Sequence, residues 1–129
     1  MDINQNDITE RLKELKIEDF IWVIYIGIIF LSWIANYLER KYFLFDDLES
    51  KEKYRTIMII IFSILVIVYY YFYKESLSDI NKLREYDTDK KKILTIISSI
   101  ASLLILISGI IFLIVAILDE DLDVELAFN

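Results

Sequence analysis

Hydrophobic residues are gathered in three long runs, and nearly every charged side chain lies between these runs. Residues 20–38, 56–73 and 93–118 contain no Asp, Glu, Lys or Arg. As helices with a rise of roughly 1.5 Å per residue, the runs would be about 28, 27 and 39 Å long. The hydrocarbon core of a bilayer is about 30 Å thick. The pattern therefore predicts three transmembrane segments.

The distribution of polar side chains within the runs decides between helix and strand, and between membrane and water. Between residues 57 and 71, the one strongly polar side chain before the tyrosines is Ser63. A helix in water keeps a polar face, and membrane-barrel strands are about ten residues long with alternating polarity. Neither pattern is present, so we expect an all-α, polytopic integral membrane protein with three transmembrane helices, arranged as a helical bundle.

The segments outside the runs are short and charged, and they give no sign of a second domain. We expect a single membrane domain, 1–129, with an amphipathic N-terminal segment at 1–19, loops at 39–55 and 74–92, and an acidic tail at 119–129. Asp7 and Glu10 have capping-box spacing, which predicts a short amphipathic helix that lies on the membrane surface or packs on the second loop. Thr88 falls within the expected start of the third helix.

Basic residues are distributed unevenly between the two sides of the expected membrane domain. Lys and Arg number three in 1–19, five in 39–55, six in 74–92 and none in the tail. With three spans, the side of the N-terminus and second loop carries nine, and the opposite side carries five. The positive-inside rule predicts a multi-pass protein of the cell membrane with a cytoplasmic N-terminus and an external C-terminus.

Composition removes most kinds of catalytic chemistry. The chain has no His and no Cys, and its net charge of −7 argues against nucleic-acid binding. The spans carry no ionisable side chain of the kind on which proton relays and ion-coupled transport depend. We expect no enzymatic activity, no cofactor, no metal ion and no small-molecule substrate.

The third run carries the most specific pattern, a stripe of small and hydroxylated residues. Thr95, Ser98, Ser102 and Gly109 follow one another at steps of three, four and seven, which place them on one helix face. Small residues allow close approach of helix backbones in membranes, and hydroxyl groups bond across the contact. The stripe predicts a helix–helix interface. Three interpretations stay open. The stripe packs against the first two helices, it packs against another copy or another protein, or it lines a water-filled pore.

The tail places acidic residues at every second position from Asp119 to Glu125. Three interpretations stay open: a solvated acidic tail, a docking peptide for a basic partner, and a calcium site. The tail lacks the glycine and the 12-residue spacing of an EF-hand loop.

These patterns favour a small non-catalytic membrane protein that acts through protein–protein contacts, as an accessory, regulatory or immunity-type subunit. Expected partners are membrane lipids and a membrane protein, or a second copy of the chain. The bias to Ile, Lys and Asn over Ala indicates an A+T-rich bacterial genome.

In span count, size and serine-bearing third span, the chain resembles the small three-span holins of phages. The resemblance includes no residue motif, and the acidic tail departs from the basic tail usual in that group. It implies the alternative function, a homo-oligomeric pore-former that permeabilises the cell membrane.

Overall fold

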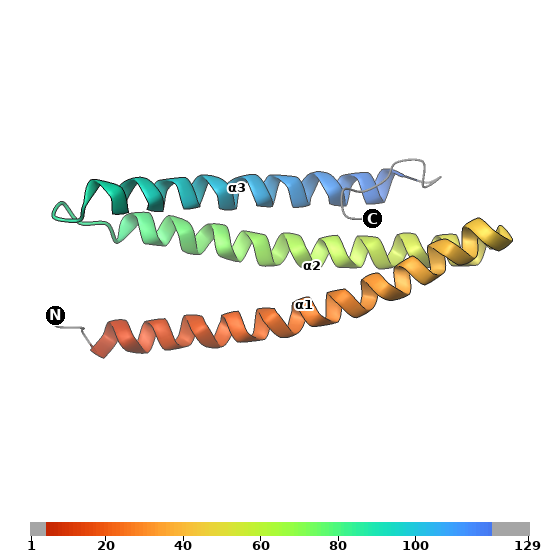
Figure 1. Ribbon diagram of the computed structural model, residues 1–129, viewed down its shortest axis with the longest axis horizontal. Coiled ribbons are helices and arrows are strands. Elements are labelled where there is room, and N and C mark those ends of the chain that lie inside the picture. Colours follow the sequence, from red (N-terminus) through yellow and green to blue (C-terminus); the bar gives the residue numbers. More distant parts are fainter. Residues whose placement is uncertain (1–4, 120–129) are drawn as a thin grey trace.

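The computed structural model describes residues 5–119, which form three long α-helices in antiparallel succession. These are α1 (Gln5–Phe45), α2 (Leu48–Asn81) and α3 (Asp89–Leu118). Figure 1 shows α2 between α1 and α3, with the start of α1 at the same end as the α2–α3 connection. The fold is therefore all-helical.

Each of the three helices is long and apolar enough to cross a membrane. Large apolar side chains point outward all around them: Trp33 is 71% exposed and Ile67 is 69% exposed. A soluble protein rarely exposes so much apolar surface, whereas lipid tails solvate it without penalty. The prediction of three helices that are long and apolar enough for membrane insertion is confirmed.

The helices continue well beyond the uncharged runs. The segment 1–19, expected as a separate short helix, is from Gln5 onward the beginning of α1, and Asp7 lies inside its first turn instead of capping it. The connections between helices are shorter than the expected loops: residues 46–47 in place of 39–55, and residues 82–88 in place of 74–92. Extending an existing helix avoids the cost of nucleation, and the Glu, Lys and Arg residues of these segments are good helix formers.

Two aspartates reverse the chain between α1 and α2. Asp46 adopts a left-handed conformation with φ of 51°, which Asp tolerates better than most residues, and its N–H donates to the carbonyl of Tyr42 at 2.8 Å. Asp47 is the N-cap of α2, and its carboxylate accepts from the backbone N–H of Glu49 at 3.1 Å and the hydroxyl of Ser50 at 2.9 Å. The bond from Glu49 satisfies a backbone N–H that has no acceptor inside the helix.

We expect Asp47→Ala to lower the thermal stability of the protein at neutral pH. The Ser50 hydroxyl that donates to Asp47, more than the nearby Lys41, holds the pKa of this carboxyl below its usual 3.8. A lowered pKa means that the stabilisation is complete above 3.8 and is lost as the pH falls through the pKa of the folded protein. Thermal unfolding in detergent can be monitored by circular dichroism. The unfolding temperatures of the wild type and Asp47→Ala should become equal in strong acid.

Asp47→Asn is the matched control for the cap, because it keeps one acceptor oxygen for the backbone N–H of Glu49 and cannot titrate. It should unfold near the wild-type temperature at neutral pH. If Asp47→Ala unfolds at the wild-type temperature at neutral pH, the cap does not stabilise the turn.

The buried core lies where all three helices approach one another. It contains one small residue from α1, four large residues from α2 and one small residue from α3: Ala35, Tyr54, Met58, Ile61, Phe62 and Ala116. Within residues 5–119, α1 and α3 each pack on α2 but not on each other. The result is a flat layer of helices, in which α2 is covered on two sides (Figure 1).

Candidate functional site

The flat arrangement leaves a groove over α2, between α1 and α3. Near the α2–α3 connection this groove holds a cavity of about 380 Å³, which we call the three-helix groove. All three helices line it, with Tyr25 from α1, Tyr69, Phe72, Glu75, Ser76 and Asp79 from α2, and Ser98, Ser102 and Ile105 from α3. Aromatic rings, hydroxyl groups and two carboxylates thus line one open surface.

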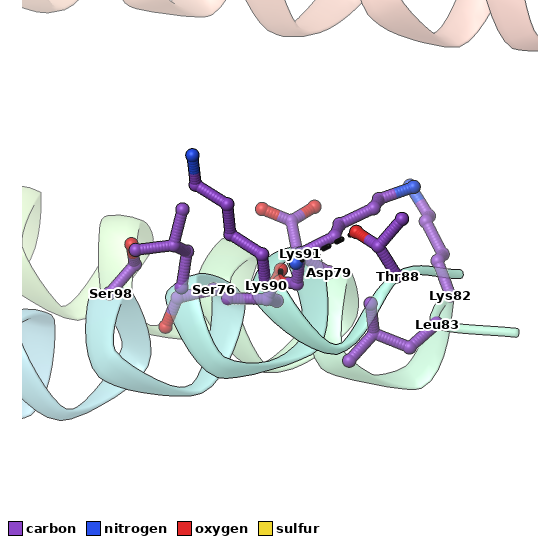
Figure 2. A pocket seen from close by; sticks show the side chains of 10 residues that line it. Ser76, Asp79, Lys82, Leu83, Thr88, Lys90, Lys91 and Ser98 are labelled. Atoms are coloured by element: carbon purple, nitrogen blue, oxygen red, sulfur yellow. Dashed lines mark hydrogen bonds between the residues drawn. The ribbon is translucent and has the colours of Figure 1, made fainter. Parts of the chain in front are cut away.

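A second cavity, of about 630 Å³, lies next to the first, beside the α2–α3 connection; we call it the basic pocket. Its lining is Ser76, Asp79, Lys82, Leu83, Thr88, Lys90, Lys91, Leu94, Thr95 and Ser98. Figure 2 shows the three lysines around it, with the carboxylate of Asp79 among them. The two cavities share Ser76, Asp79 and Ser98.

The four residues of the predicted stripe are divided between two environments. Gly109 is buried against α2, where an added Cβ would lie 2.9 Å from Cδ2 of Tyr69. Ser98 is exposed and lines both cavities, Ser102 is half-buried in the three-helix groove, and Thr95 is half-buried in the basic pocket. The structure thus brings the three hydroxyl residues together along the cavities, and of the four it places only Gly109 at the buried contact.

The contact between α2 and α3 uses a neighbouring face that sequence reasoning did not single out. Ser99, Leu106, Gly109 and Ala116 are its buried residues on α3, at steps of seven, three and seven. Ser76 of α2 donates to the hydroxyl of Ser99 at 3.3 Å. The seven-residue repeat is the signal that predicts this seam, because it keeps successive residues facing a neighbouring antiparallel helix.

Lys82, just after the end of α2, forms ion pairs with the beginning of α1, which also has ion pairs of its own. Lys82 lies 3.9 Å from Glu10 and 4.0 Å from Glu14, and Arg11 lies 3.0 Å from Glu14 and 3.7 Å from Glu18. Arg11, Lys82 and Glu10 are more than half exposed and Glu14 and Glu18 about 30% exposed, and ion pairs at a surface contribute only about 0–1 kcal/mol each. The pairs therefore orient the polar start of α1 more than they hold the helices together.

The two cavities offer groups that can bind a polar ligand. Lysine ammonium groups and hydroxyls donate hydrogen bonds, and the carboxylates of Glu75 and Asp79 accept them. The hydroxyl of Tyr71 donates to Glu75 at 2.8 Å at the edge of the groove. Within residues 5–119 no three His, Cys, Asp or Glu side chains are grouped so that they hold a metal ion.

No protein-family model, curated protein or solved structure matches this chain. Its function therefore has to be inferred from its helices and cavities alone.

Proposed function

We propose that this chain is a small, non-catalytic integral membrane protein that works by binding another membrane protein, as an accessory, regulatory or immunity-type subunit. The observation that carries the proposal is the three-helix groove. Lipid tails are as apolar as leucine, so helices in a bilayer associate through close packing and hydrogen bonds. The groove offers both, because Ser98 and Ser102 lie beside Phe72 and Ile105. A partner helix between α1 and α3 would complete a four-helix arrangement.

The proposal includes the orientation and the flanking segment that the sequence predicts. The N-terminus is cytoplasmic and the C-terminus external, supported by the nine-to-five count of basic residues. The first turns of α1 project beyond the hydrocarbon and lie at the membrane surface. Their charged residues lie beside exposed apolar side chains, such as Ile8 at 45% and Leu12 at 61% exposure, a mixture typical of interfacial helices.

Site-specific photocrosslinking in native membranes tests the proposed partner. A photoreactive phenylalanine analogue at Ser102, inside the groove, should give one discrete protein adduct. The same group at Ile67, which is 69% exposed on α2 and outside the groove, should react with lipid alone. Equal protein adducts from both positions, or none from Ser102, would contradict the proposal.

A homo-oligomeric pore of the holin type is the second candidate, and one observation favours it. Ser98 and Ser102 lie outside the buried α2–α3 contact, so their hydroxyls are available to water between copies of the chain. In the same crosslinking experiment, an adduct of twice the chain mass would favour the pore, provided that expression also releases a small dye from the cells.

A further inference from the structure

The basic pocket has an excess of positive charge where the polar and apolar parts of α3 meet. Three lysines and one aspartate line it, and no other ionisable side chain does. The start of α3 adds the partial positive charge of a helix N-terminus. The side chains of the lining therefore sum to a formal charge of +2, and lysine ammonium groups are suited to a phosphate group.

Several donors in this pocket have no partner within residues 5–119. Lys90 makes no ion pair there, and Figure 2 shows its side chain extended from α3. Ser98 donates no hydrogen bond in the described chain. The oxygen of Thr88 accepts from the backbone N–H of Lys91 at 3.1 Å, which leaves its own hydrogen free to donate.

The other two lysines are held only weakly. Lys82 reaches Glu10 at 3.9 Å and Glu14 at 4.0 Å, which are long distances for ion pairs, and Lys91 reaches Asp87 at 3.3 Å. Both lysine side chains are more than half exposed. An anion in the pocket would therefore gain two more ammonium groups at little cost in broken bonds.

The location of the pocket identifies the source of the anion. The uncharged part of α3 starts at Ile93, so the lysines lie at the level of lipid headgroups if the helix crosses a bilayer. Leu83 and Leu94 form the apolar part of the lining, and Ile93 beside it is 56% exposed. A soluble phosphate gains nothing from this apolar rim. A phospholipid has acyl chains directly below its phosphate, and these chains would contact the rim.

We propose that the basic pocket binds the phosphate of an anionic phospholipid. Lys90 and the hydroxyl of Thr88 bind the phosphate oxygens, and the ammonium groups of Lys82 and Lys91 add positive charge beside them. Basic pockets between membrane helices on the cytoplasmic side are suited to such headgroups. The pocket adjoins the three-helix groove, but the lysines and Thr88 do not line that groove, so the expected binding does not depend on the proposed protein partner.

Native mass spectrometry of the full-length protein in neutral detergent measures this binding directly. Phosphatidylglycerol should be retained about tenfold more tightly than phosphatidylcholine by the wild type. Lys90→Gln should weaken phosphatidylglycerol binding about fivefold, the factor expected for one lysine at a membrane surface. Lys74→Gln is the matched control, because this exposed lysine lies on α2 at the same end of the molecule but does not line the pocket.

Lys74→Gln should bind phosphatidylglycerol like the wild type. If it weakens binding as much as Lys90→Gln, or if the two lipids bind equally well, the attraction is diffuse and the proposal is wrong. Inorganic phosphate at millimolar concentration should not displace the lipid; displacement would mean that the pocket takes free phosphate. Circular dichroism should show unchanged helix content in Lys90→Gln, because the side chain it replaces is exposed and makes no ion pair within residues 5–119.

Discussion

Gly109→Leu is expected to separate α3 from α2. An added Cβ at this position would lie 2.9 Å from Cδ2 of Tyr69 and 3.5 Å from Cγ2 of Val66, and leucine adds three further carbons. The phenol ring must swing aside, or the helix backbones must move apart. Overpacking of this kind costs about 1–3 kcal/mol in protein cores. In a bilayer the loss is serious, because close packing is the main force between helices.

Ile107→Leu is the matched control, since Ile107 is two residues away and 43% exposed. Purified in detergent, the wild type and Ile107→Leu should elute as one monodisperse peak. Gly109→Leu should elute as a broad or shifted peak and unfold at a lower detergent or denaturant concentration. Gly109→Ala should resist unfolding less well than the wild type and better than Gly109→Leu, because the Tyr69 ring has to move by a smaller distance. Wild-type behaviour of Gly109→Leu would show that the two helices do not meet at this residue.

The three spans could be predicted from sequence because hydropathy alone sets them. A run without charge that matches the thickness of the hydrocarbon has one stable form in lipid, the helix. Helix ends were harder to predict, since the charged segments that flank the runs have no hydropathy signal of their own. Residues 39–45 and 74–81 are helical because they continue helices that already exist, and the turn at Asp46 and Asp47 is set by local hydrogen bonds.

The faces of α3 could be predicted only in part. The stripe that contains Ser98, Ser102 and Gly109 borders an adjacent face that contains Ser99, and the buried contact takes residues from both. Isoleucine and leucine fill the rest of the surface, so no amphipathic pattern shows which face is covered. The structure resolves the choice through Ser99, which is 6% exposed and meets Ser76 of α2. This contact joins residues 23 positions apart, which no local pattern reveals.

The basic pocket could not be predicted from local patterns for a similar reason. Lys82 directly follows α2 and Lys90 lies in the first turn of α3, and they line one cavity only because residues 82–88 fold the two helices back on each other. In the sequence this segment is a basic loop, whose lysines and arginines predict the orientation of the protein in the membrane. The structure adds that three of its lysines line one cavity, which places these charges around a single space.

Cysteine labelling should give an all-or-none result for orientation, because the chain has no cysteine of its own. Glu49→Cys lies just after the α1–α2 turn, where the native side chain is 76% exposed, and Tyr86→Cys lies in the α2–α3 connection, where the tyrosine is 79% exposed. The nine basic residues on the Tyr86 side favour the cytoplasm for that end. In intact cells, a membrane-impermeant maleimide should therefore label Glu49→Cys and leave Tyr86→Cys unmodified.

Permeabilised cells supply the positive control, since both variants should then be labelled. Ile67→Cys supplies the negative control: it lies in the middle of α2, exposed on the outer surface of the helices, where lipid excludes the water that forms the reactive thiolate. Labelling of Tyr86→Cys but not Glu49→Cys in intact cells would reverse the proposed orientation. The basic pocket would then face the external leaflet, and the positive-inside rule would fail for this chain because its α1–α2 turn region is itself rich in lysine and arginine.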